Sequence, residues 1–147
     1  MAGFKGRADY SVDSKGRVAI PAKMRNAMNP EANGAFTITR GTKRNIYLYP
    51  QDRWREMEEE LRKKKMYRGE TEDAVRLLYM WADDVSLDSQ GRIRIPESLK
   101  AFAGITDRAV ILGTYDKIEI WNPETLAAHL NGLEEQYETL AERVFGE

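Results

Sequence analysis

The sequence DSKGRVAIP at residues 13–21 returns as DSQGRIRIP at residues 88–96, with six of the nine positions identical. A repeat at this separation indicates that the chain contains two copies of one small unit. The repeated part is a charged turn that leads into a strand ending at a proline. Positions at which the two copies differ can therefore separate residues that build the fold from residues that serve a function.

The two copies align well beyond this motif. Three further pairs of segments match: 9–12 with 84–87, 36–41 with 108–113, and 46–49 with 118–121. Apolar residues such as Val18 and Ile20 stand at alternate positions, which is the spacing of a strand. Each copy therefore predicts the order strand, turn, strand, short helix, strand, turn, strand, helix.

This order predicts an α+β fold of two tandem units, residues 1–70 and 71–147, with Arg68-Gly69-Glu70 as the joint. Pro21 and Pro96 suit the first turn of the two short helices, where a missing N–H costs nothing. Either unit alone would be marginally stable, because a chain of that size buries little surface. We therefore expect the two copies to pack around a shared core.

Three longer helices are predicted, over 51–67, after Thr71, and from Asn122 onward. Thr71 and Asn122 are suitable N-caps, and Pro123 suits the first helical position. Along the last helix, apolar residues recur at alternating steps of four and three: Leu126, Leu130, Leu133, Tyr137, Leu140 and Val144. Such a heptad-like stripe indicates either core within the chain or a contact between subunits.

The composition excludes several classes of protein. The chain has no cysteine, so it has no disulfide framework, no thiolate nucleophile and no cysteine-ligated metal. It also has no long apolar run and no signal-peptide pattern at its N-terminus. We expect a cytoplasmic protein without a membrane partner.

Charge is distributed unevenly along the chain. The formal net charge is −1, but residues 1–44 carry nine Lys/Arg and three Asp/Glu, whereas residues 72–147 carry seven and fifteen. A basic end on an acidic chain is typical of a surface that binds a polyanion. Chance clustering of solvated charge is the alternative interpretation.

The repeated motif has the chemistry of a tight turn. Asp13 and Asp88 can accept hydrogen bonds from backbone N–H groups two residues on. Gly16 and Gly91 supply a positive φ at little steric cost. Arg17 and Arg92 begin the next strand, close enough to pair with the aspartate of their own copy.

The cations of the first copy are mostly absent from the second. Lys5, Arg7, Lys15, Lys23 and Arg25 correspond to Met80, Ala82, Gln90, Ser98 and Lys100. In the later hairpin, Arg40, Lys43 and Arg44 correspond to Leu112, Tyr115 and Asp116, while Arg94 replaces Ala19 as an exception. This pattern places the functional face on the first copy.

Lysine and arginine near turns and strand starts suit a β-hairpin or loop that enters a DNA groove. Arginine can read guanine through two parallel hydrogen bonds, whereas lysine mainly contributes charge. The predicted DNA-binding residues are Lys5, Arg7, Lys15, Arg17, Lys23 and Arg25.

The run from Phe4-Lys5-Gly6 through the first Asp-Ser-Lys-Gly-Arg motif to Pro21, together with the second motif ending at Pro96, resembles the MraZ family. That family belongs to the AbrB/SpoVT swapped-hairpin superfamily of bacterial DNA-binding proteins. The resemblance covers essentially the whole chain, and two such motifs at this distance are a specific signal. By motif, Asp13, Lys15 and Arg17 are the signature residues of the first copy.

The resemblance implies a core made of two AbrB-like hairpin units, which form an intrachain pseudo-dimer of β-barrel-like shape with flanking helices. It also implies a nucleoid-associated transcriptional regulator, usually a repressor, of the bacterial division and cell-wall gene cluster. Such regulators bind repeated elements in double-stranded promoter DNA as rings of identical subunits.

The role of Arg17 stays open between DNA contact and packing. Because Arg92 persists in the acidic copy, the Asp–Arg pairs can serve the turn or subunit packing. This turn and packing motif comprises Asp13, Gly16, Asp88, Gly91 and Arg92. Gln90 removes the central cation from the second copy, so equal DNA binding by both halves is not expected.

An AbrB-type antitoxin, or another protein-interaction module, is the alternative function. Such relatives usually carry one hairpin unit and a flexible partner-binding tail, and here a second ordered copy occupies the place of the tail. No enzyme is expected, because the chain lacks the Gly-x4-Gly-Lys loop, the Gly-x-Ser-x-Gly elbow and a histidine-based metal motif. We accordingly expect no catalytic residues, metal, cofactor or small-molecule substrate.

Overall fold

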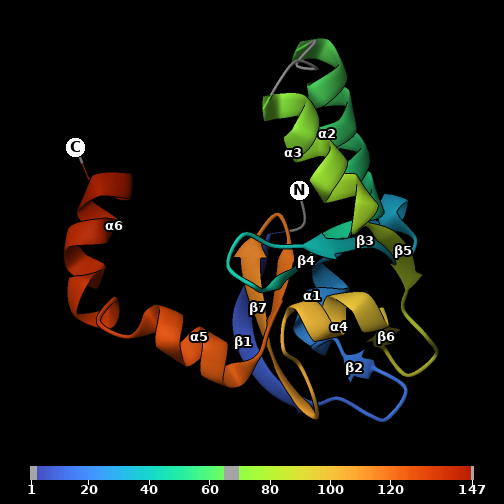
Figure 1. The fold of residues 1–147 in the computed structure, drawn as a ribbon, viewed down its shortest axis with the longest axis horizontal. Helices are drawn as coiled ribbons and strands as arrows, with labels where there is room; N and C mark the ends of the chain where they lie inside the picture. The colour runs from blue at the N-terminus through green and yellow to red at the C-terminus, as the bar shows by residue number, and fades with distance from the viewer. Residues whose placement is uncertain (1–2, 65–69, 147) are drawn as a thin grey trace.

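The computed structural model describes residues 3–64 and 70–146. Within these residues, the strands form a six-stranded and a two-stranded antiparallel sheet (Figure 1). The strands are β1 (Phe4–Ser11), β2 (Arg17–Ala19), β3 (Ala35–Arg40), β4 (Ile46–Pro50), β5 (Asp83–Ser86), β6 (Arg92–Arg94), β7 (Arg108–Tyr115) and β8 (Ile118–Trp121). The α-helices are α1 (Ala22–Ala27), α2 (Gln51–Lys64), α3 (Glu70–Met80), α4 (Glu97–Phe102), α5 (Pro123–Leu130) and α6 (Tyr137–Phe145).

The strand order of the large sheet reflects the sequence repeat. Its order is β1-β7-β8-β4-β3-β5, and β2 pairs with β6 in the small sheet. Strands β1, β3 and β4 of the first copy are equivalent to β5, β7 and β8 of the second. When equivalent strands are exchanged, the sheet has the same strand order read from its other edge. The first strand of each copy thus pairs with the third strand of the other. The two tandem units are interleaved, in agreement with the predicted α+β pseudo-dimer.

The expectation of a barrel-like core is only partly met. Strands β1 and β5 form the two edges of the large sheet, and each has one neighbouring strand in the part of the chain that the structure describes. A closed barrel would need these edges to meet. The sheet shown by the structure is open. The packing of the two copies around one core is as the repeat predicted, but the barrel-like shape that the resemblance implied is not shown.

Both copies contribute to one hydrophobic core. Val18 and Ile20 of the first copy are buried beside Ile93 and Ile95 of the second. These residues alternate with exposed or half-exposed neighbours, as expected for short strands with one covered face. The core extends to apolar residues of the central strands: Phe36, Ile38, Ile46, Leu48, Ile111, Ile118 and Ile120. Since the core is shared, neither copy buries its apolar face alone.

The short helices begin one residue later than predicted. Pro21 and Pro96 occupy the N-cap positions of α1 and α4, and the helices start at Ala22 and Glu97. Each helix places one side chain in the core, Met24 in α1 and Leu99 in α4. The prediction of two short helices after the prolines is otherwise confirmed.

Helices α2 and α3 lie side by side at the top of Figure 1, next to β3 and β4. They are held by a tilted ring contact between Trp54 and Tyr79, whose hydroxyl also donates to Glu58 at 2.7 Å. The last predicted residues of α2, 65–67, and part of the predicted joint lie outside the described residues. The boundary between units at residues 70 and 71 stays a prediction.

The predicted C-terminal helix is in fact two helices. Asn122 caps α5 as expected, since its Oδ1 accepts the backbone N–H groups of Glu124 at 2.8 Å and Thr125 at 3.1 Å. The helix then stops, and Gly132 adopts a φ of +81° before α6 begins. A period-based prediction misses such a break, because the apolar spacing continues across it.

The two parts of this segment differ in burial. Leu126 of α5 is buried against Val110 and Trp121. Helix α6, by contrast, has no buried residue and stands away from the body of the protein (Figure 1). The stripe is therefore intrachain core in α5 and an exposed apolar face in α6.

Candidate nucleic-acid interface

The two repeated turns have the same hydrogen bonds. Asp13 Oδ1 accepts the backbone N–H groups of Lys15 and Arg17, each at 2.9 Å, and Oδ2 accepts Arg17 Nε at 2.7 Å. Asp88 accepts the corresponding groups of Gln90 and Arg92 at 2.8, 3.0 and 3.0 Å. Each aspartate therefore fixes both the turn and the guanidinium of its own arginine.

These hydrogen bonds favour the charged form of both aspartates. The backbone N–H of Arg17 is the largest cause that lowers the pKa of Asp13, to about 2, although partial desolvation opposes it. The pKa of Asp88 is lowered for the same reason, by the backbone N–H of Arg92. Both turns consequently carry an ionised carboxylate near neutral pH.

The turns also pack against the opposite copy. Gly91 has a φ of +73°, and a Cβ placed on it would lie 2.7 Å from Arg25 Nε. Gly16 has a φ of +81°, and its Cβ would lie 3.0 Å from the Ile95 carbonyl oxygen. Glycine is thus needed at both positions for the backbone conformation and for the close approach of the other copy.

Strands β2 and β6 form a two-stranded ribbon between these turns. Arg17 is opposite Arg94, and Ala19 is opposite Arg92. Val18 and Ile93, the pair between them, point into the core. Because side chains alternate along a strand and directly paired residues share a face, all three arginines lie on the outer face of the ribbon.

This ribbon changes where the basic surface lies. The repeat comparison placed the functional face on the first copy, but Arg92 and Arg94 come from the second. The guanidinium of Arg92 also lies 3.9 Å from Asp13, which joins the two motifs. In the alignment of the two copies, Arg94 is only an exception to the loss of cations. Arg92 and Arg94 stand at alternate positions of the sequence, which places them on one face of a strand. Only the pairing of β2 with β6 puts that face beside Arg17.

A second basic group lies along the edge strand β1. Lys5 and Arg7 are exposed on its outer face, and Arg7 Nε pairs with Asp9 at 3.2 Å. Lys23 of α1 reaches the same strand, since its Nζ would lie 3.5 Å from a Cβ on Gly6. Because side chains alternate along a strand, a Cβ on Gly6 points away from the face that carries Lys5 and Arg7. Lys5 and Arg7 therefore share one face of β1, and Lys23 lies on the other.

Two remaining predicted residues lie near the ribbon but differ in exposure. Lys15 is exposed on the Asp13 turn. Arg25 is half-buried, since its Nε donates to the Ile20 carbonyl oxygen at 2.9 Å and its side chain packs against Gly91. Arg25 therefore supports the second turn. That role depends on a residue far away in the sequence and was not predicted.

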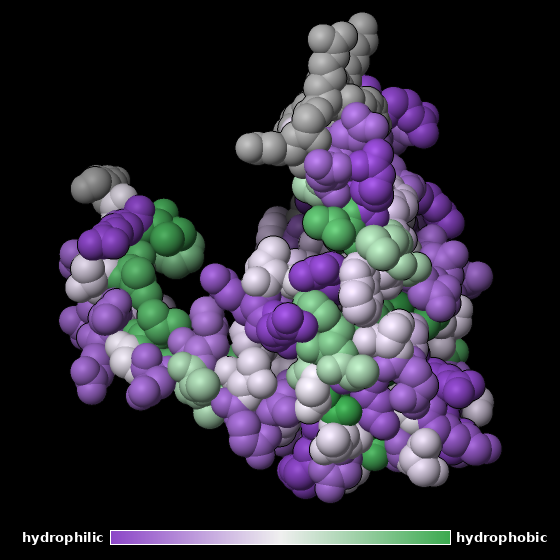
Figure 2. Space-filling view, in the orientation of Figure 1, coloured by the Kyte–Doolittle hydropathy of each residue, from purple (hydrophilic) through white to green (hydrophobic). Residues whose placement is uncertain are grey.

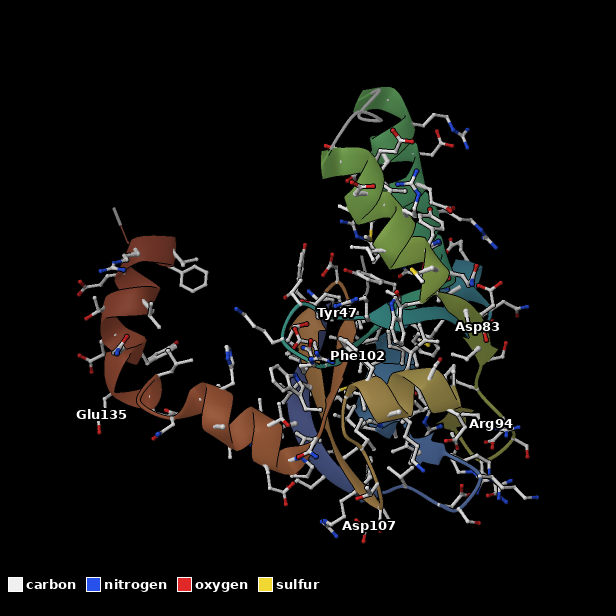
Figure 3. All side chains as sticks on the ribbon, in the orientation of Figure 1. Tyr47, Asp83, Arg94, Phe102, Asp107 and Glu135 are labelled. Carbon is white, nitrogen blue, oxygen red and sulfur yellow. The ribbon has the colours of Figure 1, made fainter. Side chains whose placement is uncertain are left out.

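The two turns and the ribbon project from the same end of the molecule. Arg94 lies at the lower right of Figure 3, on the side where both turns extend from the body. Helix α1 carries Lys23 toward β1 and Arg25 toward the Gly91 turn, so it links the two basic groups. The interleaved strands thus combine cations that are far apart in the sequence.

A protein-family model described as "MraZ protein, putative antitoxin-like" matches residues 4–77 and, a second time, residues 78–147. The chain belongs to the MraZ family. The double match agrees with the two copies indicated by the repeated motif, and it confirms the resemblance drawn from the sequence. MraZ proteins are regulators and are not a known family of enzymes.

Two other classes of site are absent from the residues that the structure describes. Residues 3–64 and 70–146 contain no group of three or more His, Cys, Asp or Glu residues that could hold a metal ion. None of the helices described for these residues combines the length and the apolar character needed to cross a membrane. His129, the one histidine of the sequence, is exposed and stacks on Trp121 at a ring distance of 5.5 Å.

Proposed function

We propose that this protein is a sequence-specific DNA-binding transcriptional regulator that contacts double-stranded DNA through the β2–β6 ribbon. One observation carries the proposal: Arg17, Arg92 and Arg94 share the outer face of a two-stranded antiparallel ribbon. The major groove of B-DNA admits such a ribbon, and arginine can donate two hydrogen bonds to O6 and N7 of guanine. In keeping with its family, the protein represses the promoter of the division and cell-wall gene cluster.

The predicted cations fall into different roles in this proposal. Arg17 and Arg94 read base edges, and Lys15 contacts a phosphate beside the first turn. Lys5 and Arg7 on one face of β1, and Lys23 on the other, contact the DNA backbone at the edge of the sheet, where charge matters more than geometry. Arg25 acts indirectly, because it holds the Gly91 turn in place.

The pairing of Arg17 with Asp13 is compatible with DNA contact. The carboxylate accepts the Nε–H of Arg17, which leaves the two terminal nitrogens to donate elsewhere. A guanidinium is planar and presents its donors in a fixed fork. Asp13 therefore orients Arg17 toward the outer face of the ribbon, so turn formation and DNA recognition can use the same residue.

Self-assembly into a ring is part of the proposal. Helix α6 exposes an apolar face that includes Tyr137, Val144 and Phe145, visible along the helix in Figure 2. The same chain exposes a second apolar patch at Leu77 and Met80 of α3. Two unlike patches on one chain suit head-to-tail contact between copies, and such contacts form rings when the rotation closes. A ring would bind repeated promoter elements through effective concentration.

The test is a titration of the purified protein against its own upstream DNA and a shuffled duplex at several salt concentrations. Binding should favour the upstream DNA and weaken as salt is added. The logarithm of the binding constant should fall against the logarithm of the salt concentration, with a slope of about 0.9 for each phosphate contact. Arg7→Ala should lower that slope by about one, whereas Arg55→Ala, which removes an exposed arginine on α2, should leave it unchanged. Binding that ignores both salt and sequence would contradict the proposal.

An antitoxin-like protein-interaction module remains the second candidate. It is favoured by the family description and by the uncovered apolar face of α6. This function predicts that a non-self protein copurifies in a fixed stoichiometry and is released by substitutions on α6. A purified protein that self-assembles, binds no other chain and recognises its upstream DNA would exclude it.

A further inference from the structure

The hairpin loop between β3 and β4 carries a cluster of cations outside the surface described above. The Arg40 and Arg44 guanidinium carbons lie 4.6 and 4.9 Å from the centre of the Phe102 ring. Arg40 also lies 5.7 Å from the ring of Trp81, which contacts Phe102 at 5.2 Å. Lys43 is exposed in the same loop. Figure 3 labels Phe102 near the centre of the view, at the C-terminal end of α4.

These cations lack an acidic partner among the side chains that the structure describes. Among residues 3–64 and 70–146, no carboxylate oxygen lies within 4.0 Å of the charged nitrogens of Arg40, Lys43 or Arg44. Arg53 of α2 pairs by contrast with three carboxylates. Since both guanidinium groups lie within 4.9 Å of one ring centre, they lie within about one Debye length of each other at 0.1 M salt. Their mutual repulsion favours the binding of an anion nearby.

The loop that carries the cluster is held in one shape. The buried side chain of Asn45 accepts the backbone N–H of Lys43 at 3.2 Å and donates to Glu119 at 3.2 Å. Arg44 adopts a φ of +59°, an uncommon conformation for a residue with a side chain. Such conformations persist where surrounding structure enforces them, and they concentrate at binding sites. The loop is therefore organised before any ligand arrives.

The sequence repeat provides an internal comparison. At the equivalent positions of the other copy, Arg40 and Arg44 are replaced by Leu112 and Asp116, and Phe102 is replaced by Ala27. Asp116 forms an ion pair with Arg53 at 3.1 Å. The fold thus uses this hairpin in both copies but needs the basic and aromatic cluster in neither. A functional role explains why the cluster occurs only once.

We propose that Arg40, Lys43 and Arg44 form a binding site for a phosphate group beside the rings of Phe102 and Trp81. Guanidinium donors match the oxygens of a phosphate, and the rings hold the guanidinium groups in position while limiting their hydration. The phosphate belongs either to the DNA backbone or to a free phosphorylated small molecule. Only the DNA source rests on the proposed function.

The first arm of the test uses inorganic phosphate alone. Isothermal titration at constant ionic strength compares the wild-type chain with the double variant Arg40→Gln, Arg44→Gln. The variant Arg55→Gln, Lys63→Gln is the matched control, because it removes two exposed cations of α2 that have no ring contact. Phosphate should bind the wild type and the control within twofold of each other, and the Arg40/Arg44 variant at least tenfold more weakly.

The second arm identifies the source of the phosphate. If the site contacts DNA, the Arg40/Arg44 variant should lower the salt slope of DNA binding by about one to two, and the control should not. If the slope is unchanged while phosphate binding is lost, the ligand is a free phosphorylated molecule. If the Arg40/Arg44 variant and the Arg55/Lys63 control have equal phosphate affinities and equal salt slopes, the proposed site is wrong. Phosphate binding without any DNA binding would instead overturn the proposed function and leave the site intact.

Discussion

At the scale of single residues, Asp13 and Asp88 show how one side chain organises a site. Each accepts two backbone N–H groups and one guanidinium N–H. Both contributions are local, so the sequence motif was sufficient to predict the turn. The conformation places a fixed arginine at the start of each ribbon strand, where a flexible one would lose more side-chain entropy on binding.

Asp13→Asn should make stability less dependent on pH. The pKa of Asp13 is about 2 in the folded protein, whereas an aspartate in an unfolded chain has a pKa near 3.9. A lowered pKa stabilises the fold above the unfolded value, and this contribution is lost as the pH falls through the folded value. The variant should therefore have a lower melting temperature than wild type at pH 7, with the difference shrinking between about pH 4 and pH 2.

Thermal unfolding of the wild type and the variant over that pH range measures this effect. Ser14→Ala, which changes an exposed neighbour in the same turn, is the control and should run parallel to wild type. A gap between Asp13→Asn and wild type that stays constant down to pH 2 would mean that the carboxylate charge does not stabilise the turn.

At the scale of elements, features that depend on residues close together in the sequence were predicted, and features that depend on distant residues were not. The turns, the short helices after Pro21 and Pro96, and the Asn122 cap depend on neighbouring residues, and all were predicted from the sequence. The ribbon depends on β2 meeting β6, and the role of Arg25 depends on Gly91 of the other copy. No local pattern encodes such pairings. The break before α6 was missed because Gly132 interrupts the helix without interrupting the apolar spacing.

The contact between the Gly91 turn and Arg25 leads to a stability prediction. Gly91→Ala places a side chain on a residue whose positive φ, +73°, strains alanine. It also adds a Cβ that would lie 2.7 Å from Arg25 Nε. Gly34 has a similar φ, +68°, but the Cβ of Gly34→Ala would lie 4.0 Å from the nearest side-chain atom, Cδ1 of Leu87. We expect Gly34→Ala to cost about 1–2 kcal/mol and Gly91→Ala to cost more.

Urea unfolding of both variants measures the difference. Gly91→Ala should also weaken DNA binding, because displacement of Arg25 releases the turn that precedes Arg92 and Arg94. Equal losses of stability in the two variants would show that Arg25 moves away freely and does not support the turn.

At the scale of the whole molecule, interleaving explains how an asymmetric sequence can form a nearly symmetric fold. The basic first copy and the acidic second copy share a core, a sheet and a ribbon. The charge difference predicted a basic surface on the first copy, whereas two of the three arginines of the ribbon come from the second copy. Helix α6 and α3 meanwhile leave two apolar surfaces exposed at different places on the molecule.

If the proposed ring forms through α6, removing the apolar face of this helix should leave smaller species. Val144 and Phe145 are 71% and 81% exposed, so Val144→Glu combined with Phe145→Glu should leave the fold of the single chain intact. Light scattering should show a lower mass than for wild type, and Leu77→Glu on α3 should have the same effect. Glu142→Gln, on the same helix, is the control. An unchanged mass for both sets of variants would place the subunit contact elsewhere.

The most direct measurement of a DNA-reading ribbon built from both copies is the specificity ratio of Arg94→Gln. This ratio compares affinity for the upstream DNA with affinity for a shuffled duplex at one salt concentration. Losing a bidentate contact to guanine costs about 1–3 kcal/mol, so the ratio should fall by roughly five- to 150-fold, whereas Arg55→Gln should preserve it. A ratio for Arg94→Gln equal to that of wild type, in a chain that still folds and assembles, would contradict recognition through the β2–β6 ribbon.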